Sequence, residues 1–447
     1  MKVILLAAGR SQRMKPIEDK NFLKFLGKPL VQHQLEQLIS VGLRDFVIVG
    51  GEHNLARLEE LAQMLLDEGS VDSIEVVEQK DLNDGMAGAM MSIEPVVKSG
   101  PMFVVSANDV VESKAFEMLM EAKGDGDADG ILIAKAMDEY FPGGYLNVKD
   151  GFIESIVEKP GAGNEPSNMV NIVLHYFAEA KDLFDALHQV ESEKDDRYEV
   201  GLDSLFKAGK KFKALPYDGF WQAVKFPWHV LALKEYFLKQ IPKIFPARRI
   251  GGWEADIALT AVIKGDVILE EGVKVFDHAT IIGPAYIGKN SIVATNAVVR
   301  GSMIGDNCVV GYATEVARSY WGDSVWTHSN YIGDSILGNN VSFGAGTVTG
   351  NLRFDEGNIP VNIKGEKMDS GRNKFGLITG NHVRSGVNTS FMPGVKIGTN
   401  VCIGAGIVIG EDIEDNKFVT GKFELKQYDN KVDVAAINRE ELKKKLS

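Results

Sequence analysis

Hydrophobic and polar positions follow two different periods along this chain. Over residues 1–240, short apolar runs alternate with segments in which apolar residues recur every three or four positions. The first kind predicts buried strands and the second predicts amphipathic helices. We expect strands at 3–6, 46–49, 74–77 and 102–106, and helices at 29–42, 55–67, 87–97 and 228–240. This alternation is typical of an α/β domain (Rossmann-like) with a mostly parallel sheet and helices on both faces.

From about residue 256 the period becomes six residues. An aliphatic residue followed by glycine recurs at or near multiples of six, for example at Ile282-Gly283, Ile304-Gly305 and Ile403-Gly404. One inward aliphatic residue per short strand is typical of a parallel β-helix, in which each coil stacks on the next. We expect an α/β domain at 1–240, a linker at 241–255, a β-helix at 256–425 and a charged tail at 426–447. The repeat breaks at 350–376, which predicts a loop that leaves the coil.

Composition narrows the class of protein. The 447 residues suffice for two or three domains, and 45% hydrophobic and 25% charged residues are ordinary for a globular protein. A net charge of −13 argues against nonspecific nucleic-acid binding. No apolar run is long enough to span a membrane, and the apolar run after Lys2 is cut off too early by Arg10 for a secretion signal. Cys308 and Cys402 lack metal-ligand spacing, which fits reduced thiols in a cytoplasmic protein.

The first strand leads into a turn of small residues with cations close behind. The turn is Leu6, Ala7, Ala8 and Gly9, and the cations that follow are Arg10, Arg13, Lys15 and Lys20. Small residues let backbone N–H groups approach an anion, and the cations offset its charge. At the C-terminal end of a first strand, this combination favours a triphosphate site over an ordinary turn with solvated cations.

A single carboxylate marks the end of another central strand. Asp109 closes the run MFVVSAND. In this position a carboxylate can hold Mg²⁺ on a triphosphate, and the alternative is a turn-forming aspartate.

Together, the motifs of both halves resemble the bifunctional N-acetylglucosamine-1-phosphate uridyltransferase/glucosamine-1-phosphate acetyltransferase family, especially its archaeal type, over about residues 1–425. The resemblance implies a nucleotidyltransferase domain followed by a left-handed β-helix of hexapeptide repeats. It also implies a nucleoside triphosphate and a sugar-1-phosphate as substrates, Mg²⁺ as cofactor and acetyl-CoA as a co-substrate. It further implies a homotrimer assembled through the β-helix.

The resemblance assigns the first site residue by residue. It implies that Leu6 to Gly9 hold the triphosphate and that Arg13 and Lys20 offset the charge of the departing pyrophosphate, with Lys24 as the rival of Lys20. The other residues fall into a base-binding group, Gln79, Gly85 and Met86, and a sugar-phosphate group, Gly144, Glu158, Lys159 and Asn171. Ala8 favours uridine, because thymidylyl-type members often carry glycine there.

One departure affects the metal. The family often places a second ligand in a segment of the type Trp-x-Asp-x-Gly-x-Pro-Trp-Asp, which corresponds to 221–229 here. Ala223 stands at the ligand position and cannot bind a metal, which leaves Asp218 or His229 as candidate replacements.

The resemblance also assigns the second site. It implies that His328 is the general base for the sugar amine. Arg300, Tyr331 and Asn351 are expected at the sugar phosphate, and Ala345 beside the coenzyme A channel. Two departures stand against this assignment: Gly357 and Pro360 replace lysines of the archaeal type, and Ala317 replaces a cation, with Arg318 next to it. Lys364 and Arg372 could supply charge from the loop.

The preferred interpretation is a sugar-1-phosphate nucleotidyltransferase, using UTP and N-acetylglucosamine-1-phosphate, with acetyl-CoA-dependent acetylation as a second activity. A second interpretation keeps the nucleotidyltransferase and gives the β-helix a structural or regulatory role. A third is a non-catalytic nucleotide-binding assembly protein. Arg13, Lys20, Asp109 and His328 favour catalysis, whereas Ala223 and the missing lysines favour the rivals.

Overall fold

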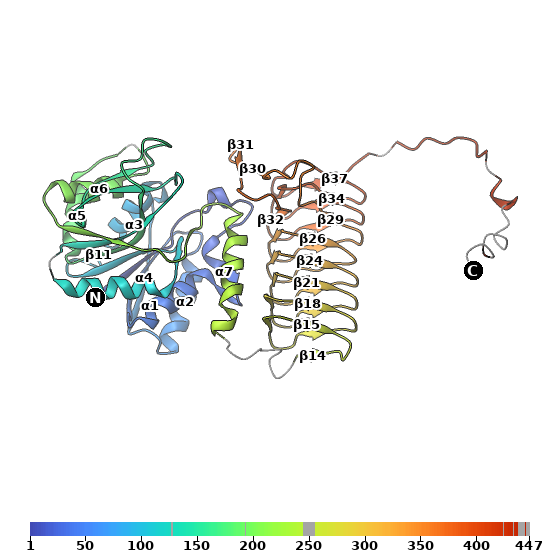
Figure 1. The fold of residues 1–447 in the computed structure, drawn as a ribbon, viewed down its shortest axis with the longest axis horizontal. Helices are drawn as coiled ribbons and strands as arrows, with labels where there is room; N and C mark the ends of the chain where they lie inside the picture. Colours follow the sequence, from blue (N-terminus) through green and yellow to red (C-terminus); the bar gives the residue numbers. More distant parts are fainter. Residues whose placement is uncertain are drawn as a thin grey trace.

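The structure is a computed structural model that describes residues 1–126, 128–192, 194–244, 255–422, 424–431, 433–436 and 443. It shows a layered α/β part beside a column of stacked coils (Figure 1). Residues 245–254 of the expected linker, and 432, 437–442 and 444–447 of the expected tail, lie outside the described residues. In the described part of the chain, no helix combines the length and apolar character needed to cross a membrane.

The first part is built on a nine-stranded sheet of order β5-β4-β1-β6-β11-β8-β12-β10-β9. The strands are β1 Lys2–Leu6, β4 Asp45–Gly50, β5 Ser73–Glu78, β6 Met102–Ser106, β8 Gly130–Ala136, β9 Gly144–Lys149, β10 Phe152–Glu158, β11 Met169–Phe177 and β12 Phe212–Pro216. The half with β5, β4, β1 and β6 is parallel, as expected. The other half is mixed, because β11 runs antiparallel to both β6 and β8.

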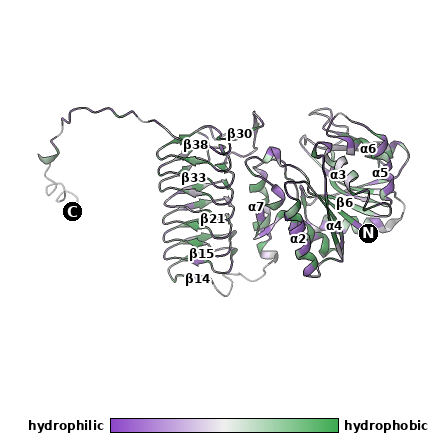
Figure 2. Ribbon diagram, turned by 180° about the vertical axis from the view of Figure 1, so that it is seen from behind, coloured by the Kyte–Doolittle hydropathy of each residue, from purple (hydrophilic) through white to green (hydrophobic). Residues whose placement is uncertain are grey.

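Helices cover both faces of this sheet. Val3 and Leu5 of β1 pack into a cluster with α1 (Leu30–Ser40), α2 (Leu55–Asp67) and α4 (Ser113–Ala122). Ile4 and Leu6 point to the opposite cluster, with α3 (Gly85–Ile93), α5 (Ala180–Gln189) and α6 (Arg197–Lys207). Hydrophobic strands therefore lie between helices that carry both hydrophilic and hydrophobic residues (Figure 2). Helix α3 ends at Ile93, before the expected residue 97, and Pro95, which has no backbone N–H to donate, follows two residues later.

Smaller elements position the rest of the chain. They are β2 (Lys24–Phe25) with β3 (Lys28–Pro29), and β7 (Asp109–Val111) with β13 (Trp221–Ala223). Short 3₁₀ helices in the described part of the chain are η1 Gln12–Met14, η2 Lys20–Phe22, η3 Leu82–Asp84, η4 Lys123–Asp125 and η5 Val434–Ala436. Helix α7 (His229–Ile244) closes the first part and faces the column of coils (Figure 1).

The column is the expected parallel β-helix with three faces, one of which consists of two four-stranded sheets linked by isolated bridges at Trp326. One face contains β14 Asp256–Ile257, β17 Lys274–Val275, β20 Ile292–Val293, β23 Val309–Val310, β28 Ser342–Phe343, β33 Arg384–Ser385, β36 Cys402–Ile403 and β38 Phe418–Val419. A second contains β15 Val262–Lys264, β18 Thr280–Ile282, β21 Val298–Arg300, β24 Glu315–Ala317, β26 Tyr331–Gly333, β29 Val348–Thr349, β34 Ser390–Phe391 and β37 Val408–Ile409. The third contains β16 Val267–Leu269, β19 Ala285–Ile287, β22 Met303–Ile304, β25 Tyr320–Trp321, β27 Ile336–Leu337, β32 Ile378–Thr379 and β35 Lys396–Ile397. All the pairs between successive coils are parallel, and the inward aliphatic residues form one continuous core.

The repeat is interrupted between β29 and β32, where the sequence predicts a loop. Strands β30 (Pro360–Ile363) and β31 (Glu366–Asp369) form an antiparallel hairpin there. Ile359, Val361 and Ile363 pack into the cluster that also contains α7, and Arg372 pairs with Glu235 of that helix at 2.8 Å. The hairpin therefore contacts the first part of the molecule.

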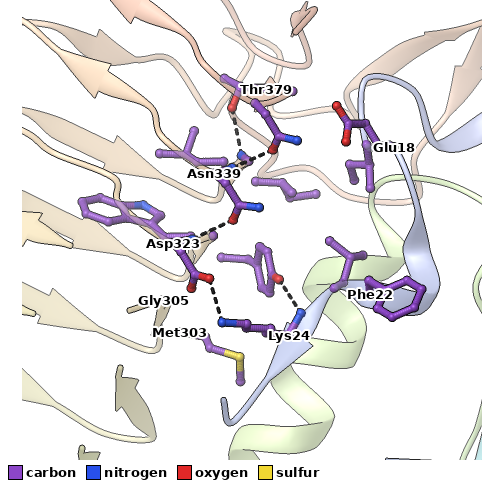
Figure 3. Close-up of a pocket in the computed structure, with 18 of the residues that line it drawn as sticks. Glu18, Phe22, Lys24, Met303, Gly305, Asp323, Asn339 and Thr379 are labelled. Atoms are coloured by element: carbon purple, nitrogen blue, oxygen red, sulfur yellow. Dashed lines mark hydrogen bonds and ion pairs between the residues drawn. The ribbon is translucent and has the colours of Figure 1, made fainter. Parts of the chain in front are cut away.

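Two lysines fasten the first part to the β-helix. Lys234 of α7 is fully buried, and its Nζ donates to the carbonyls of Gly301 (2.9 Å) and Arg318 (2.8 Å). Lys24 binds the carboxylates of Asp323 (2.7 Å) and Asp306 (3.1 Å) at the edge of a pocket of about 160 Å³ (Figure 3). None of the predicted site residues lines this pocket. Lys24, the rival of Lys20 for the triphosphate, is therefore an interface residue.

Replacing Lys234 with methionine is expected to lower the free energy of unfolding by about 1–3 kcal/mol, because it leaves two buried carbonyls without their donor. The midpoint of urea unfolding measures this effect. Lys239→Met, on the exposed side of the same helix, is the matched control. An unchanged midpoint for Lys234→Met would contradict the anchoring role.

Candidate active sites

The turn after β1 is held by hydrogen bonds to the rest of the domain and is exposed to solvent at Gly9. The N–H of Ala7 donates to the carbonyl of Val49 (2.8 Å), and the carbonyl of Ala7 accepts from Asn21 (2.9 Å) and Asn54 (3.0 Å). Gly9 is exposed, and a Cβ built on it would meet no atom within 4 Å. The turn predicted to hold the triphosphate is therefore both fixed and accessible.

The cations of the opening segment are brought to this turn by two short 3₁₀ helices. Ser11, which precedes η1, has a left-handed φ of 51°, a conformation that glycine adopts most easily. Its hydroxyl accepts from the N–H of Lys20 (3.3 Å) and so ties the two segments together. Lys20 is buried in η2, and its Nζ donates to the carbonyl of Val224 (3.0 Å). Arg13 lies in η1, with its guanidinium 5.4 Å from the centre of the Phe226 ring.

These cations are electrostatically coupled. Burial, followed by the charge of Arg13, lowers the pKa of Lys20 to about 8, whereas Asp109 opposes the shift. Burial also lowers the pKa of Arg13. Both shifts mean that the cations are partly removed from water and that the nearby carboxylates do not fully offset this cost. A bound anion would stabilise the charged form of both side chains.

Asp109 begins β7 and faces the same region. Its Oδ1 accepts from Nε1 of Trp221 at 2.9 Å. Burial raises its pKa, and the hydrogen bond from Trp221 and the charges of Lys225 and Lys20 oppose that rise. In the antiparallel pair β7–β13, the residue directly opposite Asp109 is Ala223. The residue that lacks a metal-binding side chain thus lies directly opposite Asp109.

Neither candidate replaces it. Asp218 is highly exposed and pairs with Lys114 (3.5 Å). Nδ1 of His229 accepts from the backbone N–H of Lys225 (3.1 Å), and burial lowers the pKa of His229 to about 4. Among the described residues, no cluster of three or more His, Cys, Asp or Glu side chains could hold a metal. Asp109 alone still fits Mg²⁺ that arrives on a triphosphate, since Mg²⁺ is commonly held by one or two carboxylates plus phosphate oxygens.

The predicted base-binding residues form one loop. Gln79 is buried, and its Nε2 donates to the carbonyls of Asp81 (2.9 Å) and Gly85 (2.8 Å). Gly85 and Met86 begin α3, and a side chain at Gly85, where φ is 54°, would strike the carboxylate of Asp195. The donor half of the Gln79 amide therefore shapes the loop, and only its oxygen is left for a base.

Three of the four residues predicted to bind the sugar phosphate lie together, and the fourth has a different partner. Gly144 pairs with Glu158 across β9–β10, and Glu158 binds Lys159 at 2.7 Å. Asn171 is instead hydrogen-bonded to Nε2 of His175 (2.9 Å) inside β11. Sequence reasoning missed Glu199 beside them: burial, followed by the charge of Glu158, raises its pKa to about 8. No spacing in the sequence marks this residue.

The second candidate site lies on the face of the β-helix that contains β24 and β26. Nδ2 of Asn351 donates to the hydroxyl of Tyr331 (3.2 Å) and to Oδ2 of Asp334 (2.6 Å). Arg318 donates two hydrogen bonds to Asp334, at 2.7 and 2.6 Å. Arg318 thus supplies a cation beside Tyr331, next to the position where Ala317 lacks one. Arg300 lies on the same face, paired with Glu315 at 2.7 Å.

His328 lies at a corner of the coil, three residues before Tyr331. The N–H of Gly346 donates to the carbonyl of Ser329 (3.1 Å), which stacks the segment of Ala345 on that of His328. His328 is exposed, and within the described residues its ring has no hydrogen-bond partner. Its ring nitrogens are therefore free for a substrate.

Comparison with known proteins finds relatives of this chain. Residues 2–224 match the family model described as nucleotidyl transferase. A bifunctional sugar-1-phosphate nucleotidylyltransferase/acetyltransferase from Sulfurisphaera tokodaii is 29% identical over 431 residues, covering 94% of this chain and 99% of the relative. A solved UDP-glucose pyrophosphorylase complexed with UDP-glucose aligns with 53% of this chain and 98% of its own, with 21% identity and a TM-score of 0.47.

A further relative covers both parts of the molecule. The bifunctional protein GlmU of Methanocaldococcus jannaschii is 31% identical over 448 residues, which cover 95% of this chain and 98% of the relative. The match thus extends through the nucleotidyltransferase sheet and the β-helix alike. The chain belongs to the family of the bifunctional GlmU proteins.

Proposed function

We propose that the first part of the chain transfers a uridylyl group from UTP to N-acetylglucosamine-1-phosphate and releases pyrophosphate. The observation that carries this proposal is the meeting of Arg13, Lys20 and Asp109 at the open turn after β1. The names of the relatives support the reaction class.

In the proposed reaction, an oxygen of the sugar phosphate attacks the α-phosphorus in line, and the bond to pyrophosphate breaks. Arg13 and Lys20 bind the pyrophosphate side and offset the charge that gathers there. Gly144, Glu158 and Lys159 position the sugar phosphate. Asp109 would hold Mg²⁺, which neutralises phosphate charge when it is bound.

We further propose that the β-helix acetylates glucosamine-1-phosphate with acetyl-CoA. His328 takes a proton from the sugar ammonium so that its nitrogen can attack the thioester carbonyl and release the thiol of coenzyme A. Tyr331, Arg318 and Asn351 form the polar side of the site. Exposed apolar side chains at Tyr312, Trp326 and Val348 lie around this corner and support a homotrimer in which another copy covers them. UTP and acetyl-CoA as substrates fit a cytoplasmic location.

Pyrophosphate release tests the first activity. The protein is incubated with Mg²⁺, each nucleoside triphosphate in turn and a panel of sugar-1-phosphates. Release with UTP and N-acetylglucosamine-1-phosphate is expected. Failure of every pair would leave the non-catalytic interpretation. Thiol release from acetyl-CoA with glucosamine-1-phosphate separates the bifunctional from the single-activity interpretation.

UTP binding is expected to weaken as pH rises through about 8. The ammonium of Lys20, with its pKa near 8, binds the triphosphate when protonated and loses its charge above that pH. Calorimetric titration should show about a tenfold rise of Kd between pH 7.5 and 9.5. A Kd that stays constant over this range would show that Lys20 does not bind the nucleotide in its charged form.

A further inference from the structure

Lys225 joins the nucleotidyltransferase site from a position where the family pattern has glycine. Its Nζ donates to the carbonyl of Pro142 (2.7 Å) and lies 4.2 Å from the centre of the Phe141 ring. Phe141 packs on Trp221, with ring centres 4.8 Å apart, and Trp221 donates to Asp109. Lys225 is thus part of one connected set of side chains that ends at the carboxylate.

The ammonium lies between the two substrate sides of the site. The charges of Asp109 and Arg13 on the nucleotide side, and of Glu158 and Lys159 on the sugar side, all act on it. Pro142, which holds it, directly precedes Gly143-Gly144 of the predicted sugar-phosphate site. In the proposed reaction, the uridylyl group passes from UTP to the sugar phosphate between these two sides.

Burial is the largest effect on this ammonium. Burial and the charge of Arg13 lower the pKa of Lys225, and Asp109 opposes that shift, while Glu158 and Lys159 pair with each other at 2.7 Å. Lys225 is mostly buried, and partly buried cations without enough counter-charge are costly unless an anion joins them. A phosphate group, bound by a lysine as a point charge, satisfies this requirement.

The same segment has lost a metal ligand. Ala223 faces Asp109 across β7–β13, and Lys225 adds a fixed positive charge two residues later. We propose that Lys225 is a phosphate-binding residue of this site that takes over part of the charge neutralisation otherwise left to the metal. The protein therefore binds a nucleoside triphosphate without a divalent cation. This inference rests on the proposed nucleotidyltransferase function.

Calorimetric titration with UTP, in EDTA and in Mg²⁺, tests the inference on the full chain. The wild-type Kd in EDTA is expected to lie within about tenfold of the Kd in Mg²⁺. Lys225→Met should weaken binding in EDTA by about 10- to 100-fold, which is the value of one charge-assisted contact, and weaken it less in Mg²⁺. Lys225→Arg keeps the charge and should retain binding in EDTA. Lys28→Met, which removes a surface ion pair with Glu36, is the matched control.

A double variant restores the family pattern. Ala223→Asp with Lys225→Gly should fold, by its unfolding midpoint, and should bind UTP at least about tenfold more weakly in EDTA than in Mg²⁺. Wild-type protein that binds UTP only with Mg²⁺, or Lys225→Met that binds like wild type in EDTA, would overturn the inference.

The two proposals can fail separately. Lys225-dependent binding in EDTA without pyrophosphate release from any substrate pair would uphold the inference and refute the proposed function. Pyrophosphate release by a protein whose UTP binding requires Mg²⁺ would do the reverse.

Discussion

Lys20→Met is expected to slow pyrophosphate release by about 10²- to 10⁴-fold. The ammonium of Lys20 in η2 is buried and donates to the carbonyl of Val224 (3.0 Å). Because it is already oriented and desolvated, it stabilises the developing pyrophosphate charge without reorganisation. Steady-state release of pyrophosphate from UTP and N-acetylglucosamine-1-phosphate measures the effect, which should lie mainly in kcat.

Lys24→Met is the matched control for this variant. It removes a lysine from the same segment, but one that binds Asp306 and Asp323 of the β-helix. Its rate should stay close to that of wild type, whereas its unfolding midpoint should fall. Equal rate losses in both variants would show that the segment, and not the ammonium of Lys20, is what the reaction needs.

His328→Ala is expected to lower the rate of thiol release from acetyl-CoA by about 10²- to 10⁴-fold, the usual contribution of a positioned general base. The side chain is exposed at a corner of the β-helix, and among the described residues its ring has no hydrogen-bond partner. Its removal should therefore leave the unfolding midpoint and pyrophosphate release unchanged.

His382→Ala tests whether the effect belongs to His328. Like His328, His382 lies on the β-helix, but its Nδ1 is paired with Asn340 (2.8 Å). Thiol release should persist in His382→Ala. Persistence in His328→Ala as well would remove His328 as the base, and a parallel loss of pyrophosphate release would point to misfolding.

The local patterns of hydrophobic and polar residues predicted most of the fold. The six-residue period predicted the β-helix, because each coil repeats the same burial and the inward aliphatic residues form one core. The small-residue turn and Asp109 were also visible, since both stand at the ends of buried strands, and in the structure they meet near Lys20. Their roles in catalysis remain predictions.

Contacts between distant segments could not be predicted. Lys24 looked like a phosphate ligand, and only the docking of the β-helix shows that Asp306 and Asp323 bind it. No strand was predicted at β11, and a local pattern does not reveal which strands pair or in which direction. Glu199 becomes unusual only when burial and Glu158 act on it together.

The central claim is that one chain carries both activities. The most direct test is a single reaction of the protein with Mg²⁺, UTP, glucosamine-1-phosphate and acetyl-CoA, followed by ³¹P NMR and mass spectrometry. We predict the joint appearance of pyrophosphate and UDP-N-acetylglucosamine, with the acetylated product absent when acetyl-CoA is left out. Unchanged UTP and glucosamine-1-phosphate after prolonged incubation would contradict the claim.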